Sequence, residues 1–245
     1  MNVGSTSTTA KAQKTVIKLS PLFTSAVLVV IIAAIPLGFV LLSSWQLPTD
    51  RWLTLWSQRL PLLIFNTLSL ATLVAICTVV LGISSAWFIA RREFRGKKLA
   101  VWLLILPLTI PTYVFAHIYT SLLDDDGWIG LLWHFMFGDM LALPDIYNIW
   151  GATFVLSLAG FSYVFLLARA ALENSTQSLE EAARIHGASR SEVFLRINLP
   201  LLRPAVAAAL AVVVLHVLSD FGAVSMLRFQ TFTLSIYLQM SGRFD

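Results

Sequence analysis

Five long stretches of this chain carry no acidic residue, lysine or arginine, and they constrain its fold more than any other feature. They are Leu22–Leu42, Ile64–Ala90, Leu99–Leu123, Ile146–Ala168 and Pro204–Ser219. A helix of about 20 residues spans roughly 30 Å, the thickness of the hydrocarbon core of a bilayer. Helices are required there because lipid offers no partner to backbone N–H and C=O groups. We therefore predict an all-α integral membrane protein with about five spanning helices.

The composition supports the same class of protein. Hydrophobic residues make up 58% of the chain and charged residues only 12%, whereas soluble domains carry about 25% charge. The net charge of +4 does not indicate a nucleic-acid partner, because positive charge also accumulates in the cytoplasmic loops of membrane proteins. Cys77 is the only cysteine, so no intrachain disulfide can form.

The positions of the basic residues predict the orientation. Most of the 17 lysines and arginines lie in three segments, the tail 1–20 and the loops 91–98 and 169–203. The remaining ones are Arg51, Arg59, Arg228 and Arg243. Because lysine and arginine gather on the cytoplasmic side, we expect a cytoplasmic N-terminus in the bacterial inner membrane. The loop Asp124–Tyr147, which has no lysine or arginine, is then expected on the outer side.

Prolines and short segments predict departures from straight spanning helices. Pro107 and Pro111 both fall within the third apolar stretch, and each removes a backbone donor and disfavours a continuous helix. We expect a bent or broken helix there, a device common around substrate paths. The last apolar stretch, Phe229–Gly242, has 14 residues. This is too short to span comfortably, so we expect an interfacial or re-entrant helix.

A charged segment between the fourth and fifth stretches has a fixed internal pattern. Its residues are Glu181, Ala182, Ala183, Gly187, Ile197, Leu199 and Pro200. Gly187 can adopt a positive φ and end a first short helix. Ser189 or Ser191 then caps a second short helix, and Pro200 starts the path into the membrane. We expect a rigid helix–turn–helix lying on the cytoplasmic surface.

This segment resembles the EAA loop of bacterial ABC importer permeases, in which EAA, glycine and Ile-x-Leu-Pro follow at the same spacing. The resemblance implies the transmembrane domain of a type I importer, with residues 173–203 as the EAA loop and coupling helix. It also implies two ATP-binding subunits, a second permease unit and a periplasmic substrate-binding protein. ATP and magnesium would be bound by the ATP-binding partner. This chain would be a permease subunit and not an enzyme, with no cofactor and no metal site of its own.

Shorter matches point to one branch of these permeases. The run Asn66–Leu68 resembles the start of the permease core that these importers share, and the runs Pro111–Ala116 and Asp220–Ala223 are similar to permeases of the iron(III) type. Members of that branch are often fused duplicates, and the resemblance implies the first permease unit without its final helix. Permeases for thiamine, phosphonate, sulfate and polyamines share the architecture and remain alternatives. The expected divisions are a disordered tail (1–20), the first helix with its outer loop (21–63) and the permease core (64–245).

Three residues are candidates for the substrate pathway: Asp220, His216 and Tyr113. Asp220 follows the fifth apolar stretch, and an ionisable group near membrane depth is a functional hypothesis by default. His216 lies four residues earlier, on the same helical face. The alternative for Asp220 is a carboxylate solvated by outer headgroups. A transporter driven by an ion gradient is the alternative class, but it predicts several acids or bases in the middle of the spans, and almost none occur.

Overall fold

The computed structural model describes residues 21–45, 50, 53, 56–57, 59–138, 141–175 and 177–241. The tail expected at 1–20 lies outside these residues. The chain divides into two compact units, Met1–Leu55 and Trp56–Asp245. The first contains α1 (Pro21–Trp45), whose described side chains are almost all exposed, and which continues through Pro36. An apolar helix exposed in this way is typical of a helix that faces lipid.

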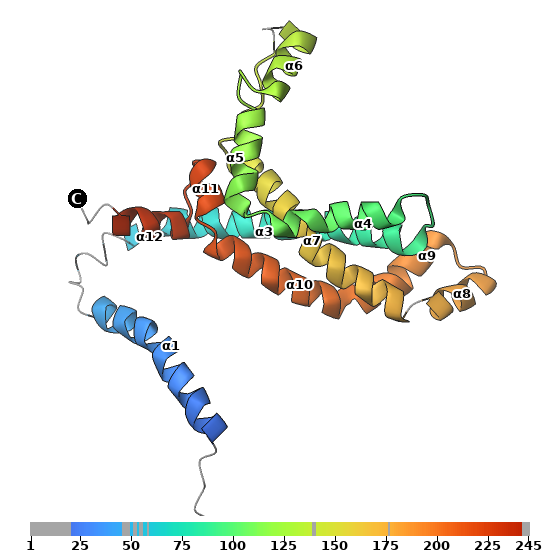
Figure 1. The fold of residues 1–245 in the computed structure, drawn as a ribbon, viewed down its shortest axis with the longest axis horizontal. Coiled ribbons are helices and arrows are strands. Elements are labelled where there is room, and N and C mark those ends of the chain that lie inside the picture. Colours follow the sequence, from blue (N-terminus) through green and yellow to red (C-terminus); the bar gives the residue numbers. More distant parts are fainter. Residues whose placement is uncertain are drawn as a thin grey trace, which may run out of the picture. The chain divides into compact units, whose positions relative to one another are not determined.

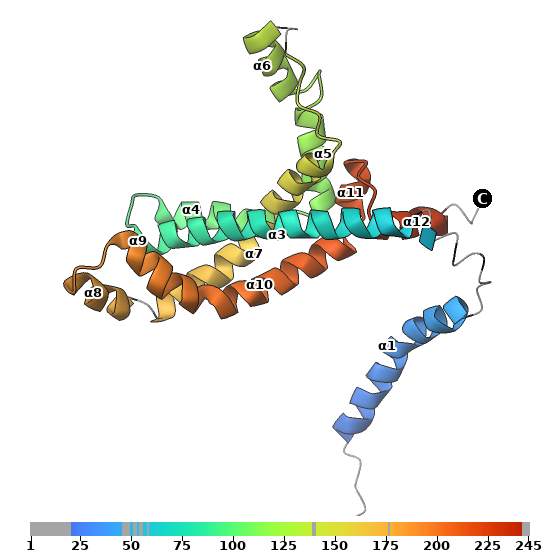
Figure 2. The same ribbon diagram turned by 180° about the vertical axis from the view of Figure 1, so that it is seen from behind.

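Three long helices form the core of the second unit. They are α3 (Leu60–Arg91), α7 (Ile149–Ser175) and α10 (Leu199–Ser219). The three run side by side (Figures 1 and 2), and each packs against the other two. Their fully buried side chains include Leu70 and Val74 of α3, Phe165 of α7 and Val213 of α10. The core therefore lies along the apolar stretches that the sequence predicts as spans.

Gly82 allows α3 and α7 to approach closely. A Cβ atom at Gly82 would lie 2.5 Å from the Cβ of Val164 and 2.9 Å from the backbone nitrogen of Phe165. No side chain fits there without movement of one helix. Membrane helices often associate through small residues of this kind, because they have little hydrophobic driving force against each other in lipid.

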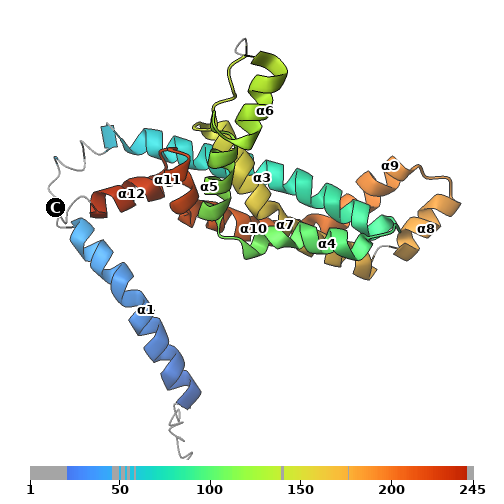
Figure 3. The ribbon, with the colours of Figure 1, turned by 45° about the horizontal axis from the view of Figure 1, so that its top comes forward.

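The third apolar stretch is broken, as its prolines predict. It forms α4 (Lys97–Ile105), the 3₁₀ helix η1 (Leu106–Thr109) and α5 (Thr112–Leu122). The two halves are bent by 102°, and Figure 3 shows α5 turning away from α4. Ile110 adopts an extended conformation, with φ −101° and ψ 122°, because Pro111 disfavours a helical residue before it. The Ser162 hydroxyl donates to the Leu104 carbonyl at 2.6 Å, which supplies a donor near the break.

The remaining helices are shorter. They are α6 (Trp128–Phe137), α8 (Gln177–Ile185), α9 (Arg190–Val193), the π-helical turn η3 (Phe194–Asn198), α11 (Gly222–Met226) and α12 (Phe232–Ser241). Two hydrogen bonds join the start of α12 to the start of α3. Asn66 Nδ2 donates to the Gln230 carbonyl at 3.0 Å, and the Phe232 N–H donates to Thr67 Oγ1 at 2.9 Å. The last short apolar stretch is therefore helical and attached to the bundle.

The described residues contain four helices long and apolar enough to cross a membrane: Ser25–Ser43, Leu60–Arg91, Ile149–Glu173 and Arg190–Ser219. The bent pair Lys97–Thr109 and Thr112–Leu122 makes a fifth if its two halves form one span. The fold is therefore almost entirely helical, with four to five candidate spans, in agreement with the sequence.

Candidate functional site

The EAA loop contains a tight turn at the glycine that the sequence singles out. Glu181, Ala182 and Ala183 lie on α8, and Gly187 follows that helix with φ +85°. The Gly187 N–H donates to the Arg184 carbonyl at 3.0 Å, and the Ala188 N–H donates to the Ala183 carbonyl at 3.1 Å. This pair of bonds is the Schellman motif, in which glycine supplies the left-handed residue. The predicted helix end at Gly187 is confirmed.

A second helix begins immediately after this turn, at Ser189. The Ser189 hydroxyl accepts from the Glu192 N–H at 3.3 Å, and Glu192 Oε2 accepts from the Ser189 N–H at 2.9 Å. This reciprocal arrangement is a capping box, which satisfies two otherwise free donors at a helix start. Of the two serines that the sequence offers as caps, Ser189 fills the role. The turn is therefore fixed on both sides by local hydrogen bonds.

The second helix is longer than the sequence suggests. The helix runs without interruption from Arg190 to Ser219, so the second short helix and the last candidate span form one continuous helix through Pro200. Within it, η3 widens to a π-helical turn, and the Leu199 N–H donates to the Phe194 carbonyl five residues back. Such turns are rare and occur frequently at functional sites. Ile197 lies within this turn, and Leu199 and Pro200 follow it at the start of α10.

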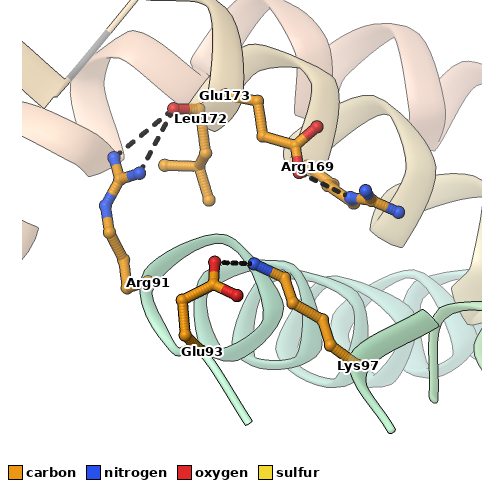
Figure 4. Close-up of polar contacts among 6 residues, drawn as sticks. All are labelled: Arg91, Glu93, Lys97, Arg169, Leu172 and Glu173. Carbon is orange, nitrogen blue, oxygen red and sulfur yellow. Dashed lines mark hydrogen bonds and ion pairs between the residues drawn. The ribbon is translucent and has the colours of Figure 1, made fainter. Parts of the chain in front are cut away.

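An ion pair attaches the loop to the bundle through a residue that the sequence pattern does not include. Arg91, the last residue of α3, contacts Glu180 of α8 through both Nε, at 2.9 Å, and Nη2. Its two terminal nitrogens also lie 3.4 Å from the Leu172 carbonyl of α7, as Figure 4 shows. The side chains of Arg91 and Glu180 are only 16% and 8% exposed. Three helices therefore meet at Arg91.

Aromatic packing adds a second contact between α3 and the loop. The Trp87 and Phe194 rings lie edge to face, with centroids 5.9 Å apart. Trp87 precedes Arg91 by one helical turn, so both residues share a face of α3. The sequence carries one signal for this attachment: the pair Arg91-Arg92 directly ends an apolar span, where an acidic partner on a neighbouring loop is expected.

The three candidate pathway residues lie around the start of α5 and the end of α10. Asp220 is buried, at 8% exposure. It accepts a hydrogen bond from the Thr112 hydroxyl and another from the Ala223 N–H at 2.8 Å. Its carboxylate is therefore held by protein groups and not by solvent. Tyr113 is exposed and packs closely on Gly222 of α11: a Cβ atom added at Gly222 would lie 3.0 Å from the Cβ of Tyr113.

His216 lies beside the broken helix, and its carbonyl accepts a hydrogen bond from the Asp220 N–H at 3.0 Å. A cavity of about 200 Å³ is lined by the segment Pro107–Thr112, Ala159, Tyr163 and His216. The Tyr163 and His216 rings are 6.2 Å apart, centroid to centroid. Among the described residues, no group of three or more histidine, cysteine or acidic side chains could hold a metal ion. The structure thus places the three candidates near one helix break, and Thr112 both bonds to Asp220 and lines the cavity with His216.

Comparison with solved structures identifies the class of fold. A chain of a bacterial alginate ABC transporter, crystallised with an alginate-pentasaccharide-bound periplasmic protein, superposes with a TM-score of 0.71 at 20% identity. The match covers 91% of this chain and 84% of that chain. A second structure of a bacterial ABC transporter involved in alginate import gives a TM-score of 0.70. The fold is that of the transmembrane domain of a type I ABC importer.

Sequence comparison then gives the family. Residues 78–242 match the binding-protein-dependent transport system inner membrane component, and the chain belongs to this family of ABC importer permeases. Similar proteins include an Fe(3+)-transport permease of Haemophilus influenzae, 28% identical over 92% of this chain and 41% of that protein. A molybdenum transport permease of the same organism is 34% identical over 64% of this chain and 67% of its own length. A probable sulfate permease of Prototheca wickerhamii is 30% identical over 66% of this chain. The chain spans 41% and 61% of the iron and sulfate relatives.

Proposed function

We propose that this chain forms the translocation pathway of an ATP-driven importer and that its EAA loop is the docking surface for an ATP-binding subunit. The observation that carries the proposal is the loop itself, a turn fixed by Gly187 and by the capping box of Ser189 and Glu192. The complete transporter would also contain two ATP-binding subunits, a second permease unit and a periplasmic binding protein. Movement of the ATP-binding subunits would reach the spans as rigid-body motion, giving alternating access.

Exposed apolar side chains on the loop support a protein partner. Ile185 is 85% exposed and Leu195 is 58% exposed, and the acidic Glu181, four residues before Ile185, is exposed as well. Burial of a leucine or isoleucine side chain that was fully exposed to water is favourable by about 1.5–3 kcal/mol. Contact with a partner would remove these side chains from water, which supports a docking role for this part of the loop. On the charge distribution of the sequence, this surface faces the cytoplasm together with the N-terminus.

Iron(III) is the substrate that we propose, because the similarity to the iron permease extends over 92% of this chain. The alternative is an oxyanion, supported by the higher identity to the molybdenum permease, 34% over 157 residues. A gradient-driven mechanism is less well supported, because the buried carboxylate of Asp220 is already held by Thr112 and the Ala223 N–H. Uptake of radioactive ferric iron, molybdate and sulfate by cells with and without the protein distinguishes these substrates.

The charge reversal Glu181→Lys tests the docking surface. If this face contacts the ATP-binding subunit, a lysine there places the wrong charge at the contact. We expect the variant to accumulate normally while its capture of the ATP-binding subunit and its transport both fall at least fivefold. Glu93→Lys is the matched control, because the Glu93 side chain is 88% exposed and pairs with Lys97, four residues away and outside the EAA loop. Unchanged capture by Glu181→Lys, or an equal loss in Glu93→Lys, would contradict the docking surface.

A further inference from the structure

We propose that Arg91 is a positioning residue that couples α3 to the EAA loop, so that displacement of the loop moves three spans instead of two. The inference rests on the proposed function of the loop. The chain itself joins the loop to α7 at one end and to α10 at the other. The helix α3 is not adjacent to the loop along the chain, so force between the loop and α3 passes through side-chain contacts.

The guanidinium of Arg91 is placed to carry that force. It binds the Glu180 carboxylate through two of its nitrogens and lies 3.4 Å from the Leu172 carbonyl. Glu180 is on α8 and Leu172 is near the end of α7. A planar guanidinium has several donors in a fixed arrangement, and lysine cannot reproduce this geometry. One side chain of α3 therefore contacts both α8, the first helix of the loop, and α7, the helix that precedes the loop.

Burial makes the Arg91–Glu180 contact difficult to open. The Glu180 side chain is 8% exposed, and a buried charge that loses its partner is strongly destabilising. The Trp87–Phe194 contact attaches η3, which directly follows the second short helix α9, to the same face of α3. Both α8 and η3 thus contact the final turns of α3. Because α3 packs extensively along α7, a displacement of these turns would be transmitted to the bundle.

Two neighbouring ion pairs differ from the Arg91–Glu180 pair, because they are more exposed and do not join separate helices. Lys97–Glu93 and Arg169–Glu173 each join residues four apart, and Figure 4 shows them beside the Arg91 contact. Glu93 is 88% exposed and Glu173 is 43% exposed. Exposed pairs of this spacing contribute little and connect no separate helices.

The experiment uses the full chain assembled with its ATP-binding subunits and binding protein in lipid nanodiscs. The binding protein is loaded in turn with ferric iron, molybdate or sulfate, and two quantities are measured: capture of the ATP-binding subunit and stimulation of ATP hydrolysis by the loaded binding protein. For Arg91→Gln and Glu180→Gln, we expect capture within twofold of the original chain and stimulation reduced at least fivefold. The exchanged pair Arg91→Glu with Glu180→Arg should regain at least half of the stimulation. Lys97→Gln is the control and should keep both.

The outcomes separate this inference from the proposed function. Normal capture with unchanged stimulation in Arg91→Gln refutes the role of Arg91 alone. A parallel loss of capture and stimulation, not regained by the exchanged pair, also refutes it, because Arg91 would then only maintain the fold of the loop. An original chain that captures no ATP-binding subunit refutes the proposed function itself.

Discussion

Replacement of Gly187 by valine tests whether the EAA loop acts through its turn geometry. Gly187 has φ +85°, and a Cβ atom there would meet nothing within 4 Å. A valine side chain therefore has space, and any effect must come from the backbone. A left-handed conformation places the Cβ of an L-residue too close to the following carbonyl oxygen, at a cost of about 1–2 kcal/mol.

This cost sets the expected size of the effect. A free-energy difference of 1–2 kcal/mol changes the population of a conformation by a factor of about 5–30. If the ATP-binding subunit recognises the loop only with the turn formed, its apparent affinity for Gly187→Val should fall by the same factor. The spans should be unaffected, because the Schellman motif of α8 involves residues of the loop alone.

The assay is a titration of the ATP-binding subunit against the purified permease in nanodiscs, with two controls. Gly187→Asn places a side chain at the same position, but asparagine tolerates the left-handed conformation, so it should lose less than threefold. Gly96→Val carries the same backbone cost, since Gly96 has φ +88° and equally open surroundings, but it lies before α4 and outside the EAA loop. Equal losses in Gly187→Asn, or in Gly96→Val, would refute the reasoning.

Two further predictions concern packing and orientation. Gly82→Val should lower the free energy of unfolding by about 1–3 kcal/mol through overpacking, because the new Cβ would lie 2.5 Å from the Cβ of Val164. Gly160→Ala, whose nearest neighbour would be Thr78 at 3.5 Å, is the control in the same thermal-unfolding measurement. A cysteine introduced as Ser189→Cys, with Cys77→Ala in the background, should resist a membrane-impermeant thiol reagent in intact cells and react after lysis. Labelling before lysis would reverse the proposed orientation.

The sequence predicts the spans and the turn well because both depend on local chemistry. Uncharged stretches can be identified without knowledge of the fold, and Pro107 with Pro111 interrupts a helix wherever it occurs. Gly187 and Ser189 act through hydrogen bonds to residues at most five positions away. Features of this range need no tertiary information.

Contacts between distant segments could not be predicted in the same way. Asp220 reaches Thr112, which is 108 residues away, and nothing in either local sequence indicates the partner. The length of the second loop helix was also missed. A short second helix capped by Ser189 or Ser191 was expected, whereas the helix that Ser189 caps continues through a π-helical turn and Pro200 as far as Ser219.

The two adjacent glutamates of α8 show how tertiary packing assigns different roles to the same chemistry. Successive residues of a helix point about 100° apart, so α8 cannot turn both carboxylates toward the bundle. Glu180 is buried and meets Arg91, whereas Glu181 is exposed. The rotation of α8 is fixed by the Arg91 contact with α3, which no local pattern contains. An inner glutamate that holds the loop and an outer one at its surface would suit the proposed coupling element, since force would enter on one face and leave by the other.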